Sequence, residues 1–158
     1  MIQRAVAAAA GRMRVATGIA LVLLAASLPA AAQEYRSIGE PAAVLYDAPS
    51  TKARRLWVIS RGYPVQVAVS IEGWTKVRDA TGDLSWVETR ALSSARTVLV
   101  RAAMGTIRDG PSETGAVVLR VGRDVVLDMV DPPAGEWVRV RHRDGATGFI
   151  HVSQVFGL

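Results

Sequence analysis

The sequence predicts an all-β protein that contains two copies of one small β unit. Between Trp137 and Arg143, valines alternate with arginines, which is the period of a strand. Asp144-Gly145 then supplies the positive φ angles of a tight hairpin turn, and residues 148–152 resume as a second strand. A similar hairpin runs from Gly73 to Glu88, so the unit is present twice.

Each element is expected from its local pattern. Residues 33–40 are expected to form a loose arm with one short strand. The alternating valines of 65–71 predict a half-buried strand. Apolar or alternating runs predict the other strands of the first copy at 44–46, 56–59, 74–78 and 86–88, and those of the second copy at 97–100, 106–108, 117–119, 125–129, 137–143 and 148–152. No helical period follows residue 32, except a short turn near Ser153.

The spacing of landmarks separates duplication from coincidence. Trp74 and Trp86 are 12 positions apart, as are Trp137 and Phe149. The turn 47–50 (Asp-Ala-Pro-Ser) corresponds to 109–112 (Asp-Gly-Pro-Ser), and we align Gly62 with Gly122 as the glycine before the alternating strand. Strand landmarks are kept while the connecting loops vary, as expected of two copies of one fold.

Residues 1–32 have the pattern of a secretory signal peptide. Three arginines precede a short apolar run at 15–26, Pro29 interrupts it, and small residues favour cleavage after Ala32. An uncleaved amphipathic anchor is the alternative. The apolar run is shorter than the roughly 20 residues that span a bilayer, and no cysteine could carry a lipid. We therefore expect a periplasmic or secreted protein that is soluble after cleavage, with no membrane span.

Charge and length limit the partners and the domain size. The chain has 19 basic and 14 acidic residues, but three of the basic ones lie in 1–32, which leaves a net charge of +2. This charge does not indicate a nucleic-acid partner. The predicted domains, 33–93 and 94–158, are very small and have no disulfides, so we expect each copy to depend on packing against the other.

The repeated pattern resembles the bacterial SH3-like (SH3b) family over nearly all of the chain after residue 32. The resemblance rests on the Pro-Ser turn, the glycine before the alternating strand, Gly-Trp-x-x-Val at 73–77 and Gly-x-x-Gly-Phe-Ile at 145–150. The first copy departs from the family pattern at Ser85, which stands in place of the second glycine. The second copy departs at Glu136, which stands in place of the glycine before the tryptophan. The resemblance implies two tandem, partly open SH3-like β-barrels. It also implies a non-catalytic module of the cell envelope that recognises peptidoglycan or tethers enzymes to it.

Residues for catalysis are scarce. The chain has no thiol nucleophile, and His142 and His151 are its only imidazoles, too few for a hydrolytic zinc site. Ser153, His151 and Asp144 could form a catalytic triad only on paper, because no nucleophile motif surrounds the serine. We expect no enzyme activity, no metal and no cofactor.

The aromatic residues are the better candidates for a binding site. Alternation places each tryptophan of the two hairpins on the outer face, among cations and opposite inward valines. Such a ring could stack on a sugar, and its cations could hold the carboxylates of a peptide. The alternative is that the rings cover the barrel mouth or join the two copies; we favour it for Trp57 and Trp86 and leave both alternatives open for Trp74 and Trp137. The candidate ligand-binding residues are Trp74, Lys76, Arg78, Trp86, Trp137, Arg139, Arg141 and Phe149.

The segment Val44-Leu45-Tyr46-Asp47 resembles the Ala-Leu-Tyr-Asp-Tyr motif of eukaryotic SH3 domains, which bind polyproline. The following loop is basic, with Lys52, Arg54 and Arg55, whereas that mode of binding uses an acidic loop. We therefore interpret the segment as a strand that enters a turn. The sequence as a whole favours a tandem module that binds a peptidoglycan fragment; the alternative is an adaptor that binds an envelope protein and leaves the wall alone.

Overall fold

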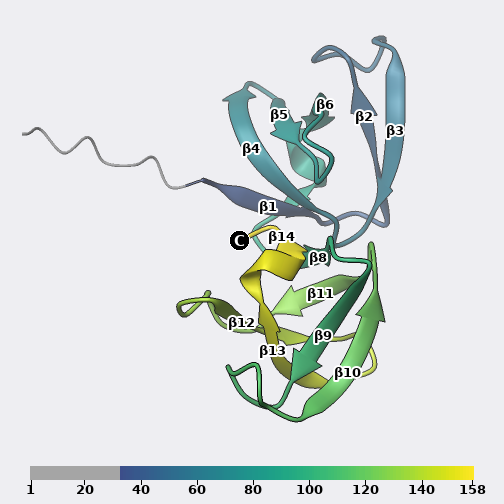
Figure 1. Cartoon of the computed structure of the whole chain (residues 1–158). Coiled ribbons are helices and arrows are strands. Elements are labelled where there is room, and N and C mark those ends of the chain that lie inside the picture. Colours follow the sequence, from purple (N-terminus) through teal and green to yellow (C-terminus); the bar gives the residue numbers. More distant parts are fainter. Residues whose placement is uncertain (1–32) are drawn as a thin grey trace, which may run out of the picture. The chain divides into compact units, whose positions relative to one another are not determined.

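The computed structural model describes residues 33–158, whose strands form two seven-stranded antiparallel sheets (Figure 1). The predicted signal peptide and its cleavage after Ala32 lie outside the described residues. Within 33–158, no helix is long and apolar enough to cross a membrane. The predicted all-β fold with two tandem barrels is confirmed.

The two sheets contain equivalent strands in the same spatial order. The first has the order β3-β2-β6-β5-β4-β1-β7 and the second β10-β9-β13-β12-β11-β8-β14, so each strand has a counterpart in the other copy. The first sheet comprises β1 (Tyr35–Ile38), β2 (Ala42–Tyr46), β3 (Arg55–Ser60), β4 (Pro64–Ile71), β5 (Trp74–Arg78), β6 (Leu84–Glu88) and β7 (Leu92–Ser93). The second comprises β8 (Thr97–Val100), β9 (Met104–Arg108), β10 (Val117–Gly122), β11 (Val126–Met129), β12 (Trp137–Arg141), β13 (Thr147–His151) and β14 (Val155–Phe156).

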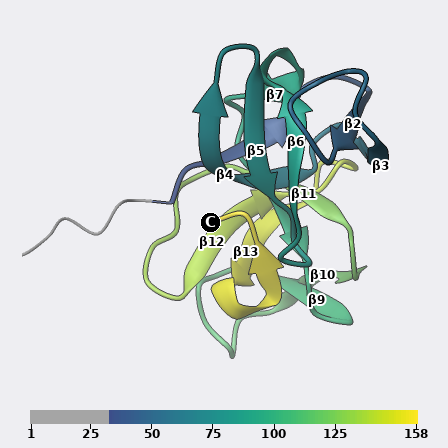
Figure 2. The same cartoon turned by 90° about the horizontal axis from the view of Figure 1, so that it is seen from above.

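A single 3-10 turn precedes the last strand of each sheet. These turns are η1 (Thr89–Ala91) and η2 (Val152–Gln154). The second matches the short turn expected near Ser153, whereas the first is not apparent from the sequence. In each sheet β3 or β10 stays at an edge, so both barrels remain partly open. Figure 2 shows β4, β5 and β6 of the first sheet from above.

The short strand expected within residues 33–40 is present as β1, but the segment is not a loose arm, because β1 pairs with both β4 and β7 and buries Ile38 to 1% exposure. One detail of the predicted alignment is wrong. The counterpart of Gly62 is Asp124, not Gly122, because the amides of Gly62 and Asp124 donate to the equivalent carbonyls of Ile38 and Val100. Both residues have positive φ, 82° for Gly62 and 65° for Asp124. The sequence did not reveal this left-handed position in the second copy because aspartate occupies it in place of glycine. Aspartate tolerates positive φ better than most residues.

The alternation of side chains builds a separate apolar core in each barrel. In β5 the buried Thr75 and Val77 alternate with outward residues, and in β12 the buried Val138 and Val140 do the same, as predicted. The second core contains Val98, Val100, Ile107, Val121, Leu127, Val138, Val140, Ile150 and Val155. The first contains Ile38, Ala43, Leu45, Val65, Val77, Val87 and Ala91. Because two members of the first core are alanines, Ile38 of β1 supplies volume that the barrel needs.

The second hairpin glycine has a packing role only in the second copy. A Cβ atom at Gly148 would overlap the carbonyl oxygen of Arg108 and lie 2.7 Å from Ile107 Cγ2, so β13 approaches β9 too closely for any side chain. In the first copy Ser85 occupies this place with 4% exposure, and its buried hydroxyl has no hydrogen-bond partner. The family pattern is therefore relaxed in the first barrel without loss of the strand.

Strand β8 joins the two barrels, and all four of its residues are buried. Val98 and Val100 point into the second core, whereas Thr97 contacts the first copy. The Thr97 hydroxyl donates to the carbonyl of Gly62 and lies 2.7 Å from Ser37 Oγ in a buried hydrogen bond. Nearby, the rings of Tyr35 and Phe156 meet edge to face at 5.4 Å. These contacts join the two copies, and the dependence of each copy on the other stays a prediction.

Replacing Gly148 with alanine should lower the free energy of unfolding by about 1–3 kcal/mol, because the new methyl group overpacks the contact between β13 and β9. Urea denaturation monitored by circular dichroism measures the loss. The matched variant Ser85→Ala should be neutral or stabilising, since it removes a buried hydroxyl that has no partner. Equal losses in the two variants would contradict this account.

Replacing Thr97 with valine should destabilise the protein by about 1–3 kcal/mol, because the Gly62 carbonyl and the Ser37 hydroxyl lose a buried partner. The same denaturation experiment applies. Thr147→Val is the control, since the hydroxyl of Thr147 makes only a local, exposed hydrogen bond to Gly145. The control should change stability by no more than about 0.5 kcal/mol. A Thr97→Val protein as stable as the wild type would show that this junction does not support the barrels.

Candidate functional site

The outer face of the first hairpin gathers the predicted aromatic and basic residues. Trp74, Lys76 and Arg78 alternate outward along β5, and Trp86 lies opposite Lys76 on β6. The Lys76 ammonium is 5.8 Å from the centroid of the Trp86 ring, a cation–π contact. Arg78 instead donates to the carbonyl of Gly82 in the hairpin turn. The first face thus presents one ring that already holds a cation.

Tyr46 completes this face, although it is not among the candidate ligand-binding residues expected from the sequence. It lies opposite Trp86 on β2, and its ring meets the Trp74 ring edge to face at 5.4 Å and 86°. Tyr46 is 6% exposed, whereas both tryptophans are half-buried. The half-buried ring of Trp74 therefore packs against the buried ring of Tyr46. The signal for Tyr46 was its place just before the Asp-Ala-Pro-Ser turn, but only the pairing of β2 with β6 puts it beside Trp74.

The second hairpin presents an equivalent face with different chemistry. Arg139 lies opposite Phe149, and Arg108 of β9, the counterpart of Tyr46, pairs with Phe149 from the other side. Trp137 meets the His151 ring edge to face at 5.3 Å. Arg139 also contacts Asp131 at 3.3 Å, and Arg141 contacts Asp128 at 3.5 Å. Phe149 thus lies in register between two arginines, and each arginine also pairs with an exposed carboxylate, Arg139 with Asp131 and Arg108 with Glu113 at 3.6 Å.

The eight predicted residues therefore fall into two groups, one on each barrel. The alternation predicted for β5, β6, β12 and β13 places their side chains outward in all cases. The burial that a packing role implies for Trp57 is wrong, because its side chain is 63% exposed on the edge strand β3. Trp86 is half-buried under Lys76. The exposed apolar surface of Trp57 was missed because its neighbours form an apolar run that looks like core.

Ser153, His151 and Asp144 do not come together as a catalytic triad. His151 Nδ1 lies 2.7 Å from Ser153 Oγ and accepts a hydrogen bond from the Ser153 amide, which caps the second 3-10 turn. Asp144 lies instead beside His142, with 2.9 Å between Oδ1 and Nδ1, although the ring nitrogen makes no aligned hydrogen bond. The amide of Ala146 and the nearby His142 hold the pKa of Asp144 below its usual value. In residues 33–158, no group of three His, Asp or Glu side chains could hold a metal ion.

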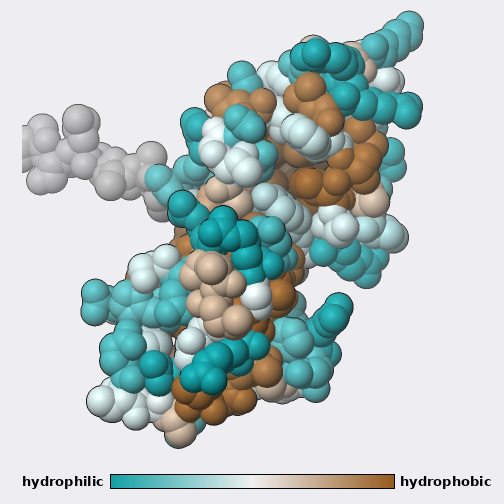
Figure 3. Space-filling view, turned by 45° about the vertical axis from the view of Figure 1, so that its right-hand side comes forward, coloured by the Kyte–Doolittle hydropathy of each residue, from teal (hydrophilic) through white to brown (hydrophobic). Residues whose placement is uncertain are grey.

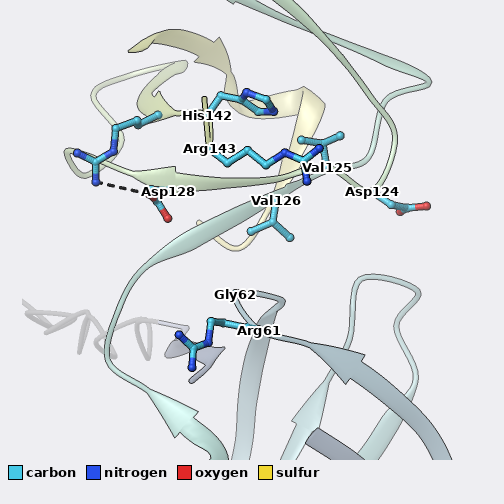
Figure 4. Close-up of a pocket in the computed structure, with 9 residues that line it drawn as sticks. Arg61, Gly62, Asp124, Val125, Val126, Asp128, His142 and Arg143 are labelled. Carbon is cyan, nitrogen blue, oxygen red and sulfur yellow. Dashed lines mark hydrogen bonds and ion pairs between the residues drawn. The ribbon is translucent and has the colours of Figure 1, made fainter. Parts of the chain in front are cut away.

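A cleft of about 500 Å³ is lined by residues of both copies (Figure 4). Arg61 and Gly62 belong to the turn before β4, while Asp128 and Arg141 come from β11 and β12. The lining contains three arginines and two aspartates, and Arg141 pairs with Asp128. Since the charges nearly balance, the cleft favours a ligand of neither sign.

Tyr63 lines a second cleft, which Asp124 also borders. Its hydroxyl accepts a hydrogen bond from the Ala80 amide at 3.3 Å. Burial raises the pKa of Tyr63 most, the hydrogen bond from Ala80 lowers it, and the negative charges of Asp79 and Asp124 raise it further, with a net upward shift. Asp79 belongs to the first copy and Asp124 to the second, so charges from both copies contribute to the raised pKa of Tyr63.

Comparisons with known proteins identify a family. The family model described as "Bacterial SH3 domain" matches the sequence twice, over residues 39–94 and 101–157. No curated protein sequence matches this chain.

Solved structures with a weak similarity include NlpC2 and NlpC1 of Trichomonas vaginalis and an NlpC/P60 family protein of Bacillus cereus. Their sequence identities to this chain are 17%, 22% and 16%, and the TM-scores are 0.37, 0.37 and 0.36. The alignments cover 80%, 85% and 78% of this chain but only 48%, 49% and 56% of those proteins. The chain thus spans about half the length of each.

The upward shift at Tyr63 predicts a loss of stability at alkaline pH. Because the pKa is higher in the folded state, the stability is fully present below about pH 10, the usual tyrosine pKa, and is lost as pH rises through the folded-state value. In Tyr63→Phe, the free energy of unfolding should therefore fall less between pH 8 and pH 11 (roughly the window set by a tyrosine). Urea denaturation across this range measures it, and an identical fall in wild type and variant would refute the assignment.

Proposed function

Because this chain belongs to the bacterial SH3 domain family, we propose that it is a non-catalytic module of the cell envelope that binds peptidoglycan. The proposal includes export of the chain by residues 1–32 and action in the periplasm or outside the cell. It divides the exported part into binding domains 33–93 and 94–158. It requires no cofactor and no nucleic acid.

One observation carries the proposal: each barrel presents a half-exposed aromatic ring beside a cation at the equivalent place on its outer hairpin. In the first barrel the pair is Trp86 and Lys76, and in the second it is Phe149 and Arg139. Trp74 and Trp137 occupy the next outward position on each face, two residues before Lys76 and Arg139. The repetition supports a role beyond packing, because the two cores do not need these outward residues.

The chemistry of both faces suits a peptidoglycan fragment. A ring edge and face that are fixed by neighbouring rings can stack on the apolar face of a sugar with little loss of conformational freedom. Peptide stems carry carboxylates, which Lys76 and Arg139 can pair with. The present partners of Arg139 and Arg141 are exposed aspartates, and such surface ion pairs contribute at most about 1 kcal/mol, so a ligand carboxylate can replace them.

The alternative is an adaptor that binds an envelope protein or enzyme and leaves the wall alone. Both functions use outward aromatic residues, so retention on purified sacculi separates them. We expect the protein comprising residues 33–158 to co-sediment with sacculi, and Trp74→Ala or Trp137→Ala to reduce the retained fraction by about fivefold to tenfold, the size typical of a central aromatic contact.

Met104→Ala and Val118→Ala are matched controls, because both residues are exposed apolar side chains away from the two hairpins. They should leave retention unchanged, and circular dichroism should show that all variants fold. No retention of the wild type at any salt concentration would contradict wall binding and leave the adaptor. Release of soluble fragments from the sacculi would contradict the non-catalytic assignment.

A further inference from the structure

Strand β3 of the first barrel is an edge strand with an unusually apolar outer surface. It lies at the end of the sheet order, so one side of its backbone pairs with no strand of residues 33–158. Val58 is 68% exposed and Trp57 63%, the two highest values among the exposed large apolar residues of the described chain. Figure 3 shows apolar surface on the barrel where β2 and β3 come forward. Long apolar edges invite pairing with another chain unless charges or proline protect them.

A cavity of about 290 Å³ adjoins this edge. Its apolar wall comprises Leu45, Trp57, Val58 and Ile59, and its polar wall comprises Asp79, Thr81 and Asp83 of the turn between β5 and β6. The two aspartates accept hydrogen bonds from Thr81 and from the Asp83 amide, within the turn itself. Within residues 33–158, neither carboxylate forms an ion pair. An apolar wall with two uncompensated negative charges therefore faces whatever covers β3.

The second barrel shows that the fold does not require this surface. Trp57 pairs with Leu45 as Leu119 pairs with Ile107, so the counterpart of Trp57 is Leu119. By the same register, the counterpart of Val58 is Arg120, a charge that protects the second edge.

The turn between β5 and β6 also differs from its counterpart between β12 and β13. The amide of Asp79 donates to the carbonyl of Asp83 as that of His142 donates to Ala146, so His142 and Ala146 replace the two acids. Trp57, the apolar Val58 in place of an arginine, and both carboxylates thus occur together in one copy only.

We propose that β3 is a docking surface for an extended, basic segment of a partner protein. The segment adds a strand of about six residues beside β3, main-chain hydrogen bonds supply affinity, and alternate side chains reach the cavity. Apolar side chains on the two faces of the added strand cover Trp57 and Val58, and a lysine or arginine faces Asp79 and Asp83. The charge of the cavity selects a basic occupant, and the surface is separate from the hairpin faces proposed for wall binding.

A titration with a designed peptide tests the proposal. The probe is the acetylated and amidated hexapeptide Val-Val-Lys-Lys-Val-Val, which has both valine and lysine on each face when extended, and its counterpart contains glutamate in place of lysine. Nuclear magnetic resonance spectra of the 33–158 protein should show shifts at the amides of Arg55–Ser60 and of the turn 79–83 with the lysine peptide only. The equivalent amides of Val117–Gly122 should not respond.

Two variants assign the contacts. Trp57→Leu, which installs the residue of the second copy, should raise the Kd about tenfold, as expected for a central aromatic contact. Asp83→Asn should raise it several-fold and reduce its dependence on salt, while the similar shape preserves the turn. Val118→Ala on the second edge is the control and should leave the Kd unchanged.

The proposal is overturned if the lysine peptide causes no shift at β3 at millimolar concentration, if the glutamate peptide binds equally well, or if β10 responds like β3. It is also overturned if analytical ultracentrifugation shows a dimer of this chain that Trp57→Leu dissociates, since a second copy then covers the edge. Trp57→Leu should still bind sacculi like the wild type, so failure of this proposal and failure of wall binding are distinguishable.

Discussion

The pleat of the β-strand is the constraint on which the rest of this protein depends. Because successive side chains point to opposite faces, a strand of four or five residues can supply only about two side chains to a barrel interior. Each barrel therefore collects its core from nearly all of its strands, with valine as the commonest buried residue. The same rule sends the intervening residues outward. Core and candidate binding face are thus two aspects of one alternation, and neither can shift without the other.

Comparison of the two copies distinguishes the positions that the fold requires from the surface positions that can vary. The core residues of the two barrels are all alanine, valine, leucine or isoleucine, while positions outside the two cores differ in chemistry: Tyr46 corresponds to Arg108, Trp86 to Phe149 and Trp57 to Leu119. Even the tight approach of β13 to β9 at Gly148 is relaxed in the other copy. The barrels are therefore not interchangeable, and each hairpin face offers its own balance of aromatic surface and charge.

The junction explains how two such small cores form one compact unit without a disulfide. Strand β8 serves the second core with two valines and contacts the first copy with Thr97, whose hydroxyl bridges Ser37 and the Gly62 carbonyl. A buried polar contact of this kind is directional, so it specifies one arrangement of the chain at the junction where apolar contact alone would allow several. The first core, with its two alanines, also gains the volume of Ile38 from β1.

Local pattern was sufficient to predict the all-β class, the two copies, the hairpin turns and the side of each strand that faces inward, because period and turn chemistry act between residues close in sequence. Local pattern could not place Tyr46 under Trp74, recognise Asp124 as the counterpart of Gly62, or include β1 in the barrel, since these depend on pairing between distant segments. It also predicted burial for Trp57, because an apolar run looks the same in a central strand and at an edge. Only the order of strands in the folded sheet decides which of the two a run becomes, and that order is set by the total burial of the whole barrel.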